Sequence, residues 1–261
     1  MKVEVLISCM YQKDTSIIQK SNIQSNVIII NQCNESSTIS QTFQNKKNEN
    51  CKLTMINTLE RGLSNSRNLA IKNATGDICI LSDDDEKFTD SYVERIIEAF
   101  TTNKEADIIV FQLIRPNKNY WKKAKKLTSL DCLKVSSVEI AFKLKSIKAN
   151  NILFDSQTGS GVSKAGGEEN IFLHDCLRKD LNIYYQPIII AELLDKESQW
   201  LASKYSNEYF IDRGRFTKKL IGGKFFAVIY AVYFTIAKIN EYKHKNYPLK
   251  AFKYMLQGIF S

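Results

Sequence analysis

Short apolar runs, too short for typical helices, recur through the first half of this 261-residue chain. Four of them read as buried strands: Val3–Ser8, Val27–Ile30, Ile78–Leu81 and Asp107–Phe111. Runs of this kind are typical of strands that are covered on both faces in a parallel sheet. Between them lie segments with apolar residues at helical spacing, over Ser64–Asn73 and Ser91–Thr101. This alternation predicts an α/β fold with a mainly parallel, Rossmann-like central sheet flanked by helices.

The pattern continues less regularly to about residue 190 and then changes. Further elements are expected over Thr15–Ser21 (helix), Thr54–Thr58 (edge-like strand), Ser137–Lys143 (strand), Asn170–Lys179 (helix) and Leu181–Tyr185 (strand, ending at Pro187). A chain of this length holds one large domain, or one domain with an appendage. We therefore predict a main domain over residues 1–205 and a helical C-terminal region over residues 206–261.

The positive charge is concentrated in the C-terminal region. From Leu201 to Ser261 there are eleven Lys and Arg residues against three acidic residues, a net charge of +8 out of the total of +9. The preceding 200 residues are therefore close to neutral, with a net charge of +1. This distribution argues against a nucleic-acid-binding protein and favours a local anionic partner for the C-terminal region.

One segment of that region, Phe225–Ile239, is apolar and aromatic and is flanked by lysines. A helix that crosses a membrane needs about 20 apolar residues, and this segment is shorter. Its composition suits a helix that lies on the surface of an anionic membrane. The alternative is a helix that packs on the main domain or in an interface between two copies of the chain, which leaves a homo-oligomer open.

The cysteines and histidines show no metal-binding or disulfide pattern. No two of the six cysteines form a CxxC pair, and His174 and His244 fit no zinc spacing. Scattered cysteines in a long chain favour buried, reduced thiols in a cytoplasmic protein. The segment Met1–Ile7 is too short and too polar for a signal peptide.

Four acidic residues, Asp83-Asp84-Asp85-Glu86, directly follow the apolar run Ile78–Leu81. So much like charge at one strand end is electrostatically unfavourable unless a cation neutralises it. Hard carboxylate oxygens suit Mg²⁺ or Mn²⁺, and open α/β sheets bind ligands at the carboxyl ends of their strands. The alternative is an acidic turn that caps the next helix. We expect Glu86, the last of the four, to be solvated.

Two further elements carry groups that are suited to chemistry. In Gly62–Asn68, Ser64 is expected to cap a helix, and Arg67 can grip a diphosphate or pair with an acid of the cluster. A helix start with a structural salt bridge is the alternative. In Gly167-Glu168-Glu169 two carboxylates open a helix after a Gly-rich loop, where one can act as a general base. Acids are also common in the first helical turn.

These elements, in this order and at this spacing, resemble family 2 glycosyltransferases, which have the GT-A fold and transfer sugars with inversion. The family's Gly-x-Ser-x-Ala-Arg-Asn-like element corresponds to Gly62–Asn68, and its Gly-Asp/Glu before an apolar strand corresponds to Gly76-Asp77. Its Asp-x-Asp corresponds to Asp83–Asp85, and its Gly-Glu-Asp to Gly167–Glu169. The resemblance covers roughly residues 1 to 190 and implies a catalytic GT-A domain followed by the C-terminal region.

For the donor, the resemblance implies a nucleotide site and a metal site that bind a nucleotide-diphosphate sugar, with a UDP-sugar favoured. Asp83 and Asp85 would hold Mn²⁺ or Mg²⁺, with Asp85 favoured as the direct ligand. Asp84 would hold the ribose or the sugar, and Arg67 would lie near the nucleotide. Asn31 stands where the family usually has an Asp that contacts the nucleobase.

For catalysis, the resemblance implies that Glu169 takes the place of the family's catalytic Asp and that Glu168 contacts a sugar. Two departures from the family pattern matter. The usual Pro-x-Tyr-Asn turn is Ser8–Gln12 here, which makes Ser8 the nucleotide contact in this turn. The base is Glu rather than Asp, which leaves the choice between Glu168 and Glu169 open.

The sequence therefore predicts a metal-dependent hexosyltransferase at the inner face of the cell membrane. It would transfer a sugar to a glycan or lipid-linked acceptor in the synthesis of capsule or cell-surface polysaccharide. Two alternatives remain: a nucleotidyltransferase on a related α/β fold, and a non-catalytic, membrane-associated subunit of a glycosyltransferase complex. The first is disfavoured because Ser8–Thr15, the loop after the first strand, lacks the glycines that such enzymes usually carry.

Overall fold

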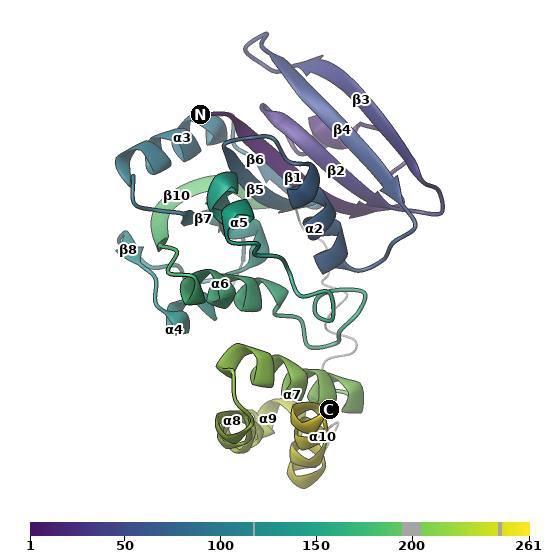
Figure 1. Ribbon diagram of the computed structural model, residues 1–261, viewed down its shortest axis with the longest axis vertical. Helices are drawn as coiled ribbons and strands as arrows, with labels where there is room; N and C mark the ends of the chain where they lie inside the picture. Colours follow the sequence, from purple (N-terminus) through teal and green to yellow (C-terminus); the bar gives the residue numbers. More distant parts are fainter. Residues whose placement is uncertain (117, 195–204, 245–246) are drawn as a thin grey trace. The chain divides into compact units, whose positions relative to one another are not determined.

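A computed structural model describes residues 1–116, 118–194, 205–244 and 247–261 of the chain (Figure 1). The chain divides into two compact units, which are described separately below. The first comprises residues 1–61, 65–154 and 172–196, and the second comprises residues 62–64, 155–171 and 197–261. The division of the sequence at residues 205 and 206 stays a prediction.

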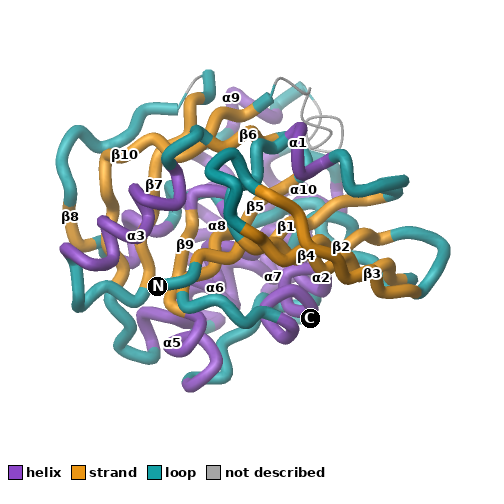
Figure 2. The backbone as a smooth tube through the Cα atoms, turned by 90° about the horizontal axis from the view of Figure 1, so that it is seen from above, coloured by secondary structure: helices purple, strands orange, loops and turns teal. Residues whose placement is uncertain are grey.

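A ten-stranded sheet forms the centre of the first unit in the described part of the chain. Its strands are β1 (Val3–Met10), β2 (Asn26–Gln32), β3 (Ser37–Gln44), β4 (Asn50–Thr58), β5 (Ile78–Asp83), β6 (Glu86–Phe88), β7 (Ile108–Ile114), β8 (Lys125–Lys126), β9 (Ile140–Lys143) and β10 (Ile183–Leu193). They follow the order β3-β4-β2-β1-β5-β9-β7-β10-β6, and β8 pairs with β10. In Figure 2 the hairpin of β3 and β4 lies at one side of the row, and β8 and β10 lie at the other.

The directions of the strands agree with the predicted α/β fold. Strands β4, β2, β1 and β5 form a continuous parallel block, and β7 and β10 run in the same direction. Strand β9 lies between β5 and β7 and is antiparallel to both. The carboxyl ends of β1, β2 and β5 therefore meet at one edge of the sheet.

Helices cover both faces of the sheet, which explains why its central strands are apolar throughout. The helices of the first unit are α1 (Ile17–Lys20), α2 (Leu63–Asn73), α3 (Tyr92–Thr102), α4 (Ser129–Cys132), α5 (Leu144–Ala149) and α6 (Glu168–Arg178), of which α2 and α6 each have their first residues in the second unit. Residues of α1 and α3 share one buried cluster with one face of the sheet. Residues of α2, α4, α5 and α6 share a second cluster with the opposite face.

Three strands, β3 and the short strands β6 and β8, were not predicted, and a fourth strand was placed wrongly in the sheet. The segment predicted as the edge-like strand Thr54–Thr58 is part of β4, which lies inside the sheet between β2 and β3. The edge strand is β3, whose residues are mostly exposed and polar. Most side chains of β3 face solvent, so the strand has no apolar run that could mark it in the sequence.

Two other boundaries differ from the prediction. Strand β10 does not end at Pro187 but continues to Leu193, with register shifts against β7 between Tyr185 and Ala191. These irregularities accommodate a proline, which cannot donate a hydrogen bond to a regular ladder. The predicted strand Ser137–Lys143 begins as a 3₁₀ turn, η1 (Ser137–Glu139), and becomes β9 at Ile140.

The Gly76-Asp77 pair anchors the start of β1. Its neighbour Glu4 is buried, and one Glu4 carboxylate oxygen accepts hydrogen bonds from the Thr75 N–H at 2.7 Å and the Gly76 N–H at 2.9 Å. A side chain at Gly76 would collide with the Glu4 Cβ. The Asp77 carboxylate accepts a bond from the Lys2 N–H at 2.6 Å. This element thus aligns β1 with β5.

Four helices make up most of the described second unit: α7 (Asn207–Ile221), α8 (Lys224–Ala237), α9 (Ile239–Tyr242) and α10 (Pro248–Phe260). They enclose a small core of aromatic and aliphatic side chains, with Phe210 and Met255 fully buried. The apolar segment Phe225–Ile239 is helical as predicted, apart from a break after Ala237. Within the described residues, no helix is long and apolar enough to cross a membrane.

The predicted burial of the thiols is confirmed. All six cysteines are free and buried, namely Cys9, Cys33, Cys51, Cys79, Cys132 and Cys176. Burial raises the pKa of the Cys132 thiol to about 12. A thiol whose ionisation is suppressed in this way is a poor nucleophile and metal ligand, so Cys132 serves packing.

Helices α7 and α10 cross so closely that only glycine fits at the contact. A Cβ on Gly214 would collide with the carbonyl oxygen of Met255, and a Cβ on Gly258 with that of Ile211. We expect Gly214→Ala and Gly258→Ala each to lower the free energy of unfolding by about 1–3 kcal/mol, although alanine favours helix by about 1 kcal/mol. Urea unfolding followed by circular dichroism measures this loss.

The control for this prediction is Gly223→Ser, because a Cβ at Gly223 meets nothing within 4 Å and serine suits the first position before a helix. This variant should unfold at the midpoint of the unaltered protein. A midpoint for Gly258→Ala at or above that of the unaltered protein would contradict the close crossing of α7 and α10.

Candidate functional site

The acidic cluster lies where the sequence predicted, at the carboxyl end of a central strand. Asp83 is the last residue of β5, and Asp84 and Asp85 form the turn that leads into β6. All three are partly exposed. The turn is held through its backbone: Lys20 Nζ donates to the Asp84 carbonyl at 2.7 Å, and the Leu194 N–H donates to the Asp85 carbonyl at 2.7 Å.

Arg67 is a partner of Asp83. Its guanidinium donates to Asp83 Oδ1 at 3.2 Å and to Ser137 Oγ at 2.8 Å, and it lies 5.4 Å from the centre of the Phe154 ring. The side chain of Arg67 is only 1% exposed, whereas that of Asp83 is 32% exposed. Of the two roles that the sequence allows for Arg67, the structure has the pairing with an acid of the cluster.

Ser66 and Asn68, the residues on either side of Arg67, also make hydrogen bonds to other segments of the chain. Ser66 Oγ donates to Ser8 Oγ at 2.8 Å, and Ser8 stands opposite Asp83 in the register of β1 and β5. Asn68 exchanges two 2.8 Å hydrogen bonds with the backbone of Phe154 and so fixes α2 to that segment. Ser8, Arg67 and Asp83 are therefore brought together at one point of the sheet edge.

Asn31 lies at the same edge, one strand further along. It is 2% exposed and pairs in register with Cys9 on β1 and Asn57 on β4. Its side-chain oxygen accepts from the Gln12 N–H, and its nitrogen donates to the Gln12 carbonyl and to Asn57 Oδ1, each at 2.8 Å. In this structure Asn31 shapes the loop after β1, and contact with a nucleobase stays a prediction.

The expectation that Glu86 is solvated is wrong. Glu86 is fully buried and accepts hydrogen bonds from Ser82 Oγ at 3.0 Å and from the Asp83 N–H at 3.4 Å. Burial, followed by the negative charge of Asp83, raises the pKa of the Glu86 carboxyl well above its ordinary value. A carboxyl that resists ionisation reduces the like-charge repulsion within the cluster, which is why four acids can follow one strand.

The metal site at Asp83 and Asp85 stays a prediction. Among the described residues, no group of three or more His, Cys, Asp and Glu side chains is arranged to hold a metal ion. Mg²⁺ is usually held by one or two carboxylates together with phosphate oxygens of the substrate and water. Asp83 and Asp85 are two partly exposed carboxylates of the kind that such a site uses.

Sequence reasoning missed a second polar cluster around Glu139. This glutamate is 1% exposed and receives hydrogen bonds from Lys118 Nζ, from Tyr120 OH at 2.9 Å and from the Ser136 N–H at 3.0 Å. It lies two residues after Ser137, the partner of Arg67, in the same 3₁₀ turn. The motif Ser136-x-x-Glu139, a capping box, was the signal that could have identified it.

The glutamate pair belongs to the second unit and begins α6. Glu168 is 4% exposed, and its side chain lies against Gly159, where an added Cβ would come within 3.3 Å of it. Glu169 is more accessible. The preceding Gly167 has a φ of 92°, and a side chain there would collide with Phe216. Ser64 was expected to cap α2, but the helix already begins at Leu63. The Ser64 hydroxyl instead donates to the Thr158 carbonyl at 2.7 Å.

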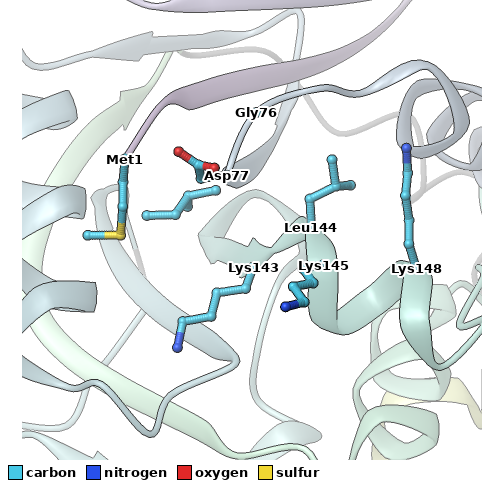
Figure 3. A pocket seen from close by; sticks show the side chains of 8 residues that line it. Met1, Gly76, Asp77, Lys143, Leu144, Lys145 and Lys148 are labelled. Atoms are coloured by element: carbon cyan, nitrogen blue, oxygen red, sulfur yellow. The ribbon is translucent and has the colours of Figure 1, made fainter.

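A shallow pocket of about 470 Å³ lies elsewhere in the first unit (Figure 3). It is lined by residues at the starts of β1 and β5, among them Met1 and Asp77, and by lysines near α5. Two of those lysines donate to backbone carbonyls, Lys143 to Lys104 at 2.8 Å and Lys148 to Ala74 at 2.9 Å. The pocket is at the edge of the sheet opposite to the acids and is not the predicted site.

The sequence matches the family described as glycosyl transferase family 2 over residues 15–167. Because this match covers more than half of the chain, the protein belongs to glycosyl transferase family 2. The matched region includes Asn31, Arg67 and Asp83–Asp85 and ends at Gly167. No curated protein matches the sequence.

Solved structures of S. aureus TarS share the fold. TarS 1–349 in complex with UDP-GlcNAc gives a TM-score of 0.65 at 14% identity, covering 99% of this chain and 82% of that one. TarS 1–349 in complex with UDP gives a TM-score of 0.60 at 14% identity, and the match covers 95% of this chain and 76% of that one. Another structure of S. aureus TarS gives a TM-score of 0.57 at 13% identity, and the match covers 83% of this chain and 39% of that one. At these identities the likeness shows the fold alone, and this fold is GT-A.

We expect the bridge from Arg67 to Asp83 and Ser137 to contribute strongly to stability. Arg67→Lys should lower the free energy of unfolding by about 2–4 kcal/mol, because an ammonium cannot make both contacts in a planar geometry. Ser137→Ala should cost about 1 kcal/mol, and less in the Arg67→Lys background. Chemical denaturation of the four proteins gives the coupling free energy.

Arg178→Lys serves as the matched control, since Arg178 pairs with Asp175 in an exposed i,i+3 contact. It should change stability by no more than about 0.5 kcal/mol. If Arg67→Lys is equally harmless, the bridge does not support the sheet edge.

Proposed function

We propose that this member of glycosyl transferase family 2 is a metal-dependent, inverting hexosyltransferase that uses a nucleotide-diphosphate sugar, with a UDP-sugar favoured. The observation that carries the proposal is the Asp83–Asp85 turn, partly exposed at the carboxyl end of β5 and paired with a buried arginine. Open α/β sheets bind their ligands at this end. The complexes of TarS with UDP-GlcNAc and UDP support the choice of a uridine nucleotide.

In the proposed donor site, each acid has a separate task. Asp85 is the direct ligand of Mn²⁺ or Mg²⁺, and Asp83 completes the metal site while Arg67 orients its carboxylate. Asp84 binds the ribose or the sugar, and Ser8 and Asn31 line the nucleotide side. The metal ion, when bound, offsets the charge that develops on the departing diphosphate.

We assign the general base to Glu169 and give Glu168 a role in sugar contact and loop packing. Glu169 is the more accessible of the two, whereas Glu168 is buried against the loop at Gly159. A carboxylate removes the proton from the acceptor hydroxyl as that oxygen attacks the anomeric carbon. One base and one metal site suffice for a single displacement, which inverts the configuration of the sugar.

The acceptor is proposed to be a glycan or a lipid-linked glycan in the synthesis of capsule or cell-surface polysaccharide. The net charge of +8 from Leu201 to Ser261 supports a location at the inner face of the cell membrane. A non-catalytic subunit is the less favoured alternative, because the acids and the glutamate pair are all present.

The metal assignment predicts that Asp85→Asn lowers metal-dependent sugar transfer or donor hydrolysis by at least about 100-fold, since the metal contributes several kcal/mol to the transition state. Activity with a panel of nucleotide sugars, in Mn²⁺, in Mg²⁺ and with a chelator, measures this effect. Asp90→Asn is the control, because the Asp90 side chain is 71% exposed and pairs with Lys46. Full activity of Asp85→Asn would refute the assignment.

The base assignment predicts that Glu169→Gln lowers kcat by about 100- to 10,000-fold and leaves KM for the donor nearly unchanged. Glu168→Gln should have a smaller effect on kcat and should lower the melting temperature, because its side chain is buried. Steady-state kinetics and thermal unfolding of both variants decide between the two residues. The reverse pattern would make Glu168 the base.

A further inference from the structure

Helix α8 is apolar on every side, although only one of its sides is packed. Between Lys224 and Lys238 its sequence contains no charged residue. Ala227, Ala231 and Phe234 are buried in the core of the four C-terminal helices. A helix that is apolar all round is normally buried in a core or in a membrane.

The unpacked side forms a continuous stripe. With 100° between successive helical residues, five side chains fall on one face, directly opposite the buried one. They are Phe225, Ile229, Val232, Tyr233 and Ile236, and each is exposed. Phe225 is 72% exposed and Ile236 is 68% exposed, at the two ends of the stripe. We call these five side chains the outer face of α8.

Positive charges border the outer face at both ends. Lys224 precedes it, and Lys238 and Lys243 follow it. Lys224 Nζ lies 5.5 Å from the centre of the ring of Phe260, which is itself 59% exposed at the end of α10. An apolar face between exposed cations complements the anionic head groups and the acyl chains of a lipid surface.

The same charges disfavour the other occupants. In a dimer of two such faces, the lysines at the ends of one helix would approach those of the other. The nearest acid in sequence, Glu241, already pairs with Lys238 at 2.6 Å. Insertion across a bilayer is excluded by length, because α8 spans about 21 Å and the hydrocarbon core is about 30 Å thick.

We propose that the outer face of α8 binds an anionic phospholipid surface, with the helix axis parallel to the membrane plane. The inference names the lipid and the residues for the membrane location given above, and it rests on that part of the proposed function. The aromatic and aliphatic side chains enter the boundary between head groups and acyl chains, and the flanking lysines contact lipid phosphates.

Co-sedimentation of the full chain with vesicles tests this proposal. Vesicles of phosphatidylcholine mixed with phosphatidylglycerol should bind the protein at least about tenfold more tightly than phosphatidylcholine alone, and less tightly at high salt. Replacing the outer face, in Phe225→Ser/Ile229→Ser/Ile236→Ser, should weaken binding at least about tenfold. Lys224→Gln and Lys243→Gln should each weaken it about fivefold, and only for the anionic vesicles.

The matched control is Leu59→Ser/Leu130→Ser/Leu153→Ser, which removes three exposed apolar side chains from the first unit and should leave binding unchanged. Since the residues of both triple variants are exposed, their thermal unfolding should match that of the unaltered protein. Equal binding by the α8 variant overturns the proposal, as does equal affinity for neutral and anionic vesicles.

Light scattering identifies the alternative occupant. A dimer that dissociates in the α8 variant, together with no vesicle binding by the unaltered protein, would assign the outer face to a second copy of the chain and overturn the proposal. Failure of the proposed enzymatic function is distinguishable, because it appears as absent donor turnover without vesicles. Asp85→Asn should bind anionic vesicles like the unaltered protein.

Discussion

The candidate site depends on one buried guanidinium. Arg67 ties the carboxylate at the end of β5 to Ser137, which lies 70 residues away and directly precedes β9 in a 3₁₀ turn. Because the same α2 helix also supplies Ser66 to Ser8 and Asn68 to Phe154, it connects four separate segments of the chain. A buried charge is favourable only with partners in good geometry, so these partners and the helix position constrain one another.

The acidic cluster persists because its four carboxyls lie in different environments. Glu86 is buried and hydrogen-bonded, with a raised pKa, and Asp83 is neutralised in part by Arg67. Asp84 and Asp85 remain partly exposed on a turn whose backbone is held by Lys20 and Leu194. A turn with an anchored backbone presents its carboxylates with less loss of conformational freedom, which is what the proposed binding of a cation together with a diphosphate requires.

The sequence predicted what short-range patterns encode. The four apolar runs became β1, β2, β5 and β7, because strands buried on both faces must be apolar throughout. Strand β3 was not predicted because most of its side chains are exposed. The predicted end of β10 at Pro187 was wrong, because the strand continues past the proline with an irregular hydrogen-bond ladder. At the site, Asp83–Asp85 and Arg67 were identified from motifs. Their long-range partner Ser137 was not, since no local pattern encodes a contact across 70 residues.

Helix α8 shows how structure resolves an ambiguity that hydropathy leaves. The segment Phe225–Ile239 is apolar enough to suit either a core or a lipid surface. In the structure, Ala227 and Ala231 allow close packing on one side, so the core of these helices is filled without the bulkier side chains. Phe225 and Ile236 therefore add nothing to this core while they are exposed to water. Burying either side chain would contribute about 1.5–3 kcal/mol. A face that combines this exposure with flanking lysines is therefore best explained by a partner that is both apolar and anionic.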